Sequence, residues 1–257
     1  MAEPTKVAPR IAIPVPHSDD RDYAERALPQ YLEAVLRAGG EPVRIELDRT
    51  PAQVKGEMER CDGVLLPGSK ADIDPRKYEA EPHKKTAPAD AQREMVDELL
   101  LQDAYKTHKP VLAICYGLQS LNVYRSGTLV QHIESDFIHN AGRAVANAHT
   151  VEVAPESLLA EIMGPGKTTL AVNSSHHQAA KAAGIGLRVV ARSTEDGIVE
   201  ALEGTFRGHF VLAVQWHPER SMKEKPELAE SAHAILHAFI AAARARRTEL
   251  ARKLEHL

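Results

Sequence analysis

The stretch that decides the fold reads Val111-Leu112-Ala113-Ile114-Cys115-Tyr116-Gly117-Leu118-Gln119. Its four leading apolar residues predict a buried strand, and Gly117 opens a helix two residues after the cysteine. Such a turn exposes the Cys115 side chain at the end of the sheet, where the first helical N–H groups and the helix dipole stabilise a thiolate. The N–H of Tyr116 is placed there to donate to an oxyanion. Taken alone, Cys115 fits a nucleophile and a buried small hydrophobe about equally well.

A second strand, predicted over 211–215, ends in Trp216-His217-Pro218-Glu219. Residues two apart in an extended segment point to the same side, so we expect His217 and Glu219 to converge while Pro218 fixes the backbone between them. A carboxylate that orients an imidazole is what a base activating a thiol requires. An isolated His-x-Glu pair is more often a surface ion pair, but its combination with a strand-end cysteine favours catalysis.

On the N-terminal side of Cys115, predicted strands alternate with predicted helices. The strands are 11–15, 43–47, 63–66 and 111–114, and the helices are 24–38, one starting at Pro51 after an N-cap at Thr50, 90–107 and 117–124. The proline-rich segment 70–89 between two of these elements is interpreted as a long loop. This alternation predicts a parallel sheet covered by helices on both faces.

In the C-terminal half, the predicted strands no longer alternate with helices. Short strands are predicted over 149–153, 169–172, 187–191, 198–202 and 210–214, with no helix between them, which indicates antiparallel additions to the same sheet. A final helix is predicted from about Pro226 to the end of the chain. Because no repeat or linker interrupts the pattern, we predict a single α/β domain over residues 1–257.

Bulk composition excludes several classes of protein. With 43% hydrophobic and 26% charged residues, the chain is typical of a folded globular protein. A net charge of −4 without a clustered basic face argues against nucleic-acid binding, and no apolar run approaches the ~20 residues of a membrane span. The first ten residues lack the apolar core of a signal peptide, and the two cysteines, Cys61 and Cys115, make no disulfide framework, so we expect a cytoplasmic protein.

Several motifs in order along the chain resemble the class I glutamine amidotransferase-like superfamily. Within it, the chain is most similar to the γ-glutamyl hydrolase branch (peptidase C26 type), which includes the γ-glutamyl-γ-aminobutyrate hydrolases. The motifs are Ala38-Gly39-Gly40, Leu66-Pro67-Gly68-Ser69 followed by Asp74-Pro75, Cys115-Tyr116-Gly117-Leu118-Gln119, Gly127-Thr128-Leu129, Val172-Asn173-Ser174-Ser175-His176-His177-Gln178, Asp196-Gly197-Ile198-Val199-Glu200-Ala201 and Gln215-Trp216-His217-Pro218-Glu219. The resemblance implies a flavodoxin-like, mostly parallel central sheet.

The resemblance also implies residue roles. Cys115 would be the nucleophile, His217 the general base and then acid, and Glu219 its orienting partner. Backbone N–H groups of Tyr116 and of Gly68 or Ser69 would form the oxyanion hole, while His176 would line the substrate pocket and Gln119 would help to hold the glutamyl group. His177 is interpreted as structural. We expect no metal, because the His176-His177 pair has no third ligand at a suggestive spacing, and no cofactor.

Three features depart from the pattern of the branch or support it only indirectly. Tyr116 stands where the aminobutyrate hydrolases commonly have arginine, which removes any substrate contact by that arginine but not the backbone N–H. The segment 136–147, which borders the pocket in the family, looks short, so the preference for a leaving group stays open. Arg93-Glu94 is interpreted as structural support for the site.

The sequence thus predicts hydrolysis of a γ-glutamyl amide through a γ-glutamyl thioester, with γ-glutamyl-γ-aminobutyrate or a related γ-glutamyl amine as the small-molecule substrate. One alternative is a glutaminase subunit that supplies ammonia to a separate synthase. Another is a non-catalytic protein that binds a γ-glutamyl metabolite. A homodimer is also compatible with the apolar residues of the last helix, which are Leu236, Phe239, Ile240, Leu250 and Leu254.

Overall fold

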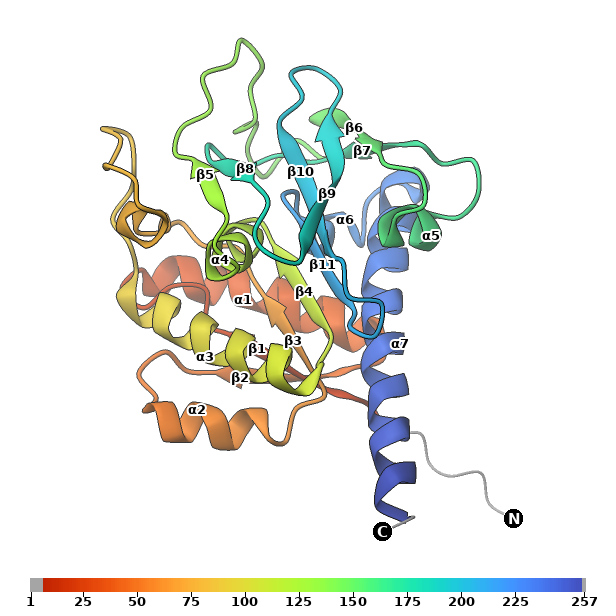
Figure 1. Cartoon of the computed structure of the whole chain (residues 1–257). Helices are drawn as coiled ribbons and strands as arrows, with labels where there is room; N and C mark the ends of the chain where they lie inside the picture. The colour runs from red at the N-terminus through yellow and green to blue at the C-terminus, as the bar shows by residue number, and fades with distance from the viewer. Residues whose placement is uncertain (1–6, 256–257) are drawn as a thin grey trace.

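A nine-stranded mixed sheet forms the centre of the computed structural model (Figure 1), which describes residues 7–255. Most of the segment expected to lack a signal peptide, and the last two residues of the expected terminal helix, lie outside these described residues. Five strands run parallel, in the spatial order β2 (Glu41–Ile45), β1 (Arg10–Pro14), β3 (Gly63–Leu66), β4 (Val111–Ile114) and β11 (Val211–Val214). The mostly parallel sheet predicted from the alternating pattern is confirmed.

Helices cover both faces of the parallel strands (Figure 1). On one face α2 (Pro51–Met58), α3 (Ala91–Thr107) and α4 (Tyr116–Tyr124) are neighbours, and on the other α1 (Arg21–Arg37), α6 (Pro218–Ser221) and α7 (Pro226–Glu255) meet. Thr50 caps α2 through a capping box with Gln53, as its position before Pro51 predicted. No helix within the described range is both long and apolar enough to cross a membrane.

Antiparallel strands extend the sheet beyond β11, in the order β10 (Val199–Gly204), β9 (Leu187–Ser193), β6 (His149–Val153) and β7 (Thr169–Val172). Two details differ from the expected series of uninterrupted strands. A short helix, α5 (Leu158–Met163), lies between β6 and β7 and is capped by Ser157. Strands β5 (Thr128–Val130) and β8 (Ala179–Ala182) pair in a separate ribbon. The expected loop over 70–89 holds one 3₁₀ turn, Pro75–Tyr78.

Helix α7 packs its apolar side onto its own chain. Leu236 and Phe239 are fully buried and Ile240 is 1% exposed, so these side chains are not free to meet a second copy. Leu250 is 42% exposed, and the side chain of Leu254 lies outside the described part. These three residues therefore complete the core of this chain and do not support a homodimer, which itself stays a prediction.

The turn after β4 depends on the absence of a side chain at Gly117. A Cβ there would lie 2.3 Å from the Leu66 carbonyl oxygen, which belongs to the backbone of β3. We expect Gly117→Ala to lower the free energy of unfolding by about 1–3 kcal/mol, since a strand backbone cannot move aside as a flexible side chain can. The matched control is Gly56→Ala in α2, where a Cβ meets no atom within 4 Å, and it should stabilise by about 0.5–1 kcal/mol. Urea unfolding measures both, and equal effects would contradict this account of the turn.

Candidate active site

Cys115 lies at the carboxyl end of β4, between the strand and α4. Its backbone has φ +54° and ψ −107°, a conformation that a non-glycine residue rarely adopts, and it occupies the N-cap position of the helix. Its N–H donates to the Val214 carbonyl at 2.8 Å, which fixes the turn against β11. Cys115 is 6% exposed, so its thiol is almost entirely shielded from solvent. The strained turn therefore aims the sulfur at the start of the helix.

His217 follows the neighbouring strand. Because β4 and β11 are parallel with Ile114 paired to Val214, their carboxyl ends bring Cys115 and His217 to the same edge of the sheet. His217 Nδ1 lies 2.8 Å from Glu219 Oε1, and both side chains are buried. They meet for a reason other than the expected one: Pro218 begins the short helix α6, so the segment is helical and not extended.

Asn173 holds the backbone of His217 in place. The His217 N–H donates to Asn173 Oδ1 at 2.9 Å, and Asn173 Nδ2 donates to the His217 carbonyl at 2.8 Å. The same amide nitrogen reaches the Ser221 hydroxyl at 3.0 Å, which ties it to α6. Asn173 was part of a quoted motif, but the sequence offered no sign that its amide would pair with a residue 44 positions away.

The turn after β3 closes the space between Cys115 and His217. A Cβ on Gly68 would lie 3.0 Å from His217 Cε1 and 3.6 Å from Cys115 Cβ, so both side chains border this glycine. The Gly68 N–H donates to the Tyr31 hydroxyl at 3.0 Å, and that hydroxyl lies 3.4 Å from His217 Nδ1. Sequence reasoning missed Tyr31, since its helical spacing in α1 is typical of a core residue.

Arg93 holds the turn after β3 in place. Its guanidinium is fully buried, donates to the Pro67 carbonyl at 2.6 Å and to the Pro16 carbonyl at 3.0 Å, and pairs with Asp97 at 2.7 Å. It also stacks on the Tyr116 ring, with the guanidinium carbon 4.8 Å from the ring centroid. The Tyr116 side chain therefore belongs to the core beneath the site, and only its backbone faces Cys115.

The sequence model of the peptidase C26 family matches residues 11–219, a range that includes Cys115, His217 and Glu219. The chain belongs to the peptidase C26 family. Members of this family are hydrolases with a glutamine amidotransferase-like fold, and the recognition made from the motifs is confirmed.

Two curated proteins illustrate the relationship. A protein of Mycobacterium tuberculosis named "Putative glutamine amidotransferase" is 38% identical over 200 residues, which cover 76% of this chain and 62% of that protein. The γ-glutamyl-γ-aminobutyrate hydrolase of Escherichia coli K12 is 32% identical over 206 residues, which cover 76% of this chain and 79% of the enzyme. Among solved structures, the glutaminase domain of Trypanosoma brucei CTPS with bound acivicin superposes with a TM-score of 0.61 at 18% identity, covering 92% of this chain and 94% of that domain.

Burial dominates the electrostatics at this peptidase C26 site. It raises the pKa of the Cys115 thiol to about 12, although the positive charge of Arg220 opposes the shift. Burial and the Arg220 charge lower the pKa of His217 to about 4, against the opposing effect of Glu219. Burial would also raise the pKa of Glu219, but its contacts with His217 and Arg220 hold it below the ordinary value. The substrate-free site therefore favours a neutral thiol, a neutral imidazole and an ionised Glu219.

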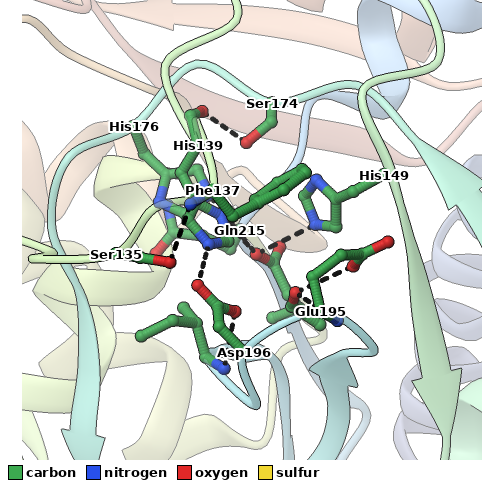
Figure 2. A network of polar contacts seen from close by, with 12 residues as sticks. Ser135, Phe137, His139, His149, Ser174, His176, Glu195, Asp196 and Gln215 are labelled. Atoms are coloured by element: carbon green, nitrogen blue, oxygen red, sulfur yellow. Dashed lines mark hydrogen bonds and ion pairs between the residues drawn. The ribbon is translucent and has the colours of Figure 1, made fainter.

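The remaining predicted residues, Gln119 and His176, lie in a buried polar network beside the site. Gln119 Nε2 donates to the Gln178 carbonyl at 3.2 Å and to Gln215 Oε1 at 3.3 Å, so its amide is engaged within the protein. His176 Nδ1 lies 2.9 Å from the same Gln178 carbonyl, and its Nε2 faces Glu200. His177 points elsewhere, toward Asp72 at 3.2 Å. Figure 2 shows His139 and His149 in the network with His176, and spacing along the chain gave no signal for either.

The protonation state gives a testable pH dependence. Because the pKa of Cys115 lies above its usual value, the thiolate fraction at neutral pH is small, and it rises with pH until that pKa is passed. We expect the rate of Cys115 alkylation by iodoacetamide, measured in a Cys61→Ala background, to keep rising beyond about pH 10. A plateau below about pH 8 would instead show a thiolate–imidazolium pair in the free protein.

Proposed function

We propose that this peptidase C26 protein hydrolyses γ-glutamyl amides, with Cys115 as nucleophile, His217 as general base and then acid, and Glu219 as the partner that orients His217. γ-Glutamyl-γ-aminobutyrate or a related γ-glutamyl amine is the proposed substrate. The observation that carries the proposal is the meeting of Cys115 and His217 on adjacent parallel strands around Gly68, with His217 Nδ1 held by Glu219. This arrangement leaves Nε2 of His217 as the nitrogen available to a thiol.

In the first half of the reaction, His217 takes the Cys115 proton as the sulfur attacks the γ-carbonyl carbon. The new C–S bond produces a tetrahedral oxyanion, which accepts hydrogen bonds from the Tyr116 N–H and from the turn that holds Gly68 and Ser69. The oxyanion then collapses, the C–N bond breaks, and protonated His217 gives its proton to the departing amine. The enzyme is left as a γ-glutamyl thioester on Cys115.

In the second half, water replaces the amine. His217 takes a proton from the water as its oxygen attacks the thioester carbon, the C–S bond breaks, and the proton returns to the sulfur. The products are glutamate and the free amine. Glu219 stays ionised throughout, because its role is to hold the imidazole tautomer and to stabilise the imidazolium that forms twice.

The Tyr31 hydroxyl affects how the substrate oxyanion would bind. Its hydroxyl accepts the Gly68 N–H, which is the donor that a substrate oxyanion would need. The oxyanion therefore either displaces this hydroxyl or uses the Ser69 N–H of the same turn. Arg93 keeps the turn in place in both cases through its bond to the Pro67 carbonyl.

Product identification tests this proposal. The isolated chain is incubated with a panel of γ-glutamyl amines, glutamine and folyl polyglutamates, and glutamate and amines are quantified by mass spectrometry. We expect release of γ-aminobutyrate or another amine without any added protein. Turnover restricted to glutamine and dependent on an added synthase would favour the glutaminase alternative, which the name of the Mycobacterium tuberculosis relative supports. Binding without turnover of any compound would favour the non-catalytic alternative.

We also propose a small-molecule γ-glutamyl substrate as the partner, with no nucleic acid or membrane, and a cytoplasmic location; a homodimer stays a prediction. Both cysteines are free and buried, which is compatible with a reducing compartment.

A further inference from the structure

Three histidines surround one buried carboxylate beside the proposed active site (Figure 2). Glu200 Oε1 on β10 lies 3.4 Å from His139 Nδ1, 3.2 Å from His149 Nε2 and 3.4 Å from His176 Nε2. The three histidines come from three places: the irregular segment before β6, the first residue of β6, and the turn between β7 and β8. Candidate ligand atoms of His139, His176 and Glu200 all lie within 4.8 Å of one another. We call His139, His149, His176 and Glu200 the histidine–glutamate cluster.

The tautomers of two histidines follow from their outer partners. His139 Nε2 lies 2.9 Å from Asp196 Oδ2, and His176 Nδ1 lies 2.9 Å from the Gln178 carbonyl, so each of these nitrogens carries a proton and donates it outward. In a neutral imidazole the other nitrogen is then an acceptor. With both rings neutral, two nitrogen lone pairs face a carboxylate oxygen, an unfavourable arrangement that either protons on the rings or a bound cation relieves.

The cluster is buried and unsatisfied. Each of its four residues is at most 5% exposed, and His139 Nδ1, His176 Nε2, both His149 nitrogens and both Glu200 oxygens have no hydrogen-bond partner within the described residues. Separations of 3.4 Å are long for a charged hydrogen bond, which is usually 2.7–2.9 Å. They match the distance of about 3.4 Å between ligand atoms placed ~2.1 Å from a tetrahedral zinc ion.

We propose that the histidine–glutamate cluster binds a divalent transition-metal ion, with Zn²⁺ as the best fit to its imidazole and carboxylate donors. His139 Nδ1, His176 Nε2 and Glu200 form the core of the site, and His149 Nε2 approaches the same oxygen from β6. The sequence argued against a metal because no third ligand stood at a suggestive spacing from His176. The fold supplies the missing ligands, His139 and Glu200, which lie 37 residues before and 24 residues after His176. No local sequence motif can indicate ligands at such separations.

The surroundings are those of a metal site. Ligating histidines commonly donate their second N–H to a carboxylate or backbone carbonyl, which is what His139 and His176 do. The ring of Phe137 packs against His139 and His149, with centroids 5.2 and 5.4 Å apart, and excludes water from that side. Asp196, which contacts His139 Nε2, also lines a cavity of about 820 Å³.

The ion would tie the segment 131–148 to the sheet. Within this segment, the His139 carbonyl accepts hydrogen bonds from the Ser174 hydroxyl and from the His176 N–H, so the same residue is anchored through both its backbone and its ring. Arg143 in the segment is exposed, and trypsin can therefore report on its order. We expect zinc to slow cleavage after Arg143.

Zinc content measures the proposal directly. All proteins carry Cys115→Ala, which removes the one thiol that lies beside a histidine in the proposed active site. Chelator-stripped protein receives one equivalent of Zn²⁺, is desalted, and is measured by mass spectrometry of the metal. We expect about one zinc per chain in the parent, loss of zinc in His139→Gln and Glu200→Gln, and affinity lower by about 10–100-fold in Asp196→Asn. Co²⁺ in the parent should give the visible absorption of a four-coordinate site.

The matched control is the double variant His233→Gln/His237→Gln, which removes a stacked pair of histidines on α7, 6.2 Å apart, and should keep its zinc. Circular dichroism of the zinc-free proteins checks folding, and the partly exposed Asp196 provides the milder variant if Glu200→Gln does not fold. If the parent holds no more zinc than Glu200→Gln, protons fill the cluster and the proposal is wrong. Zinc retained by both cluster variants would place the ion elsewhere and would equally overturn it.

Discussion

Replacing Cys115 with alanine is expected to lower kcat for γ-glutamyl amide hydrolysis on the order of 10⁶-fold, because no other thiol borders the imidazole of His217. The fold should survive, since alanine meets the same backbone demand at φ +54° as cysteine does. Steady-state kinetics and thermal unfolding of the same preparation separate the two effects.

Cys61→Ala is the matched control for this variant. Cys61 is also buried, and its thiol donates to the Glu57 carbonyl at 3.3 Å in the connection after α2. Burial raises the pKa of this thiol to about 11, so both cysteines are protonated at neutral pH and differ chiefly in their neighbours. Activity that persists in Cys115→Ala, or that disappears in Cys61→Ala, would remove the proposed nucleophile.

Replacing Arg93 with methionine is expected to cost about 3–5 kcal/mol of unfolding free energy, because Asp97 would be left buried without its partner. Both side chains are fully buried and joined at 2.7 Å. The change also removes the donor to the Pro67 carbonyl, so the Gly68 turn loses its anchor and kcat should fall by up to about 100-fold even where the variant is folded.

A double variant separates the two effects. Arg93→Met/Asp97→Leu removes both charges and should recover much of the lost stability, while the unanchored turn keeps kcat low. Lys109→Met is the control for a buried pair far from the site: Lys109 pairs with Asp103 at 2.6 Å near the start of β4, so its loss should lower stability and leave kcat unchanged. Full activity in the stable double variant would show that Arg93 does not position the turn.

The sequence predicted best those elements that short apolar runs define. The strands β3, β4, β6 and β7 begin and end at the predicted residues, because apolar or alternating side chains are bounded there by turn and polar residues. The pairing of β5 with β8 was missed, since β5 has three residues and β8 contains alanines and a lysine that carry no strand preference. Helix α6 was missed because Pro218 fits both an extended segment and a first helical turn.

Some residues of the candidate site could likewise be predicted from the sequence, and others could not. Residues that end strands could be placed from sequence, because parallel strands bring their carboxyl ends to one edge, and this located Cys115 and His217 together. Tyr31 and Asn173 act through contacts that span 186 and 44 positions, and neither residue type distinguishes such a role from packing or a turn. The histidine–glutamate cluster could not be predicted from the sequence for the same reason. Its members become neighbours only after β6, β10 and the 173–178 turn have assembled.

The proposed thioester can be observed directly. The enzyme is mixed with γ-glutamyl-γ-aminobutyrate, quenched with acid during turnover, and digested for mass spectrometry. The account predicts one glutamyl residue attached to the peptide that contains Cys115, released by hydroxylamine and absent from Cys115→Ala. Product formation with no adduct on Cys115, or with the glutamyl group on another residue, would contradict it.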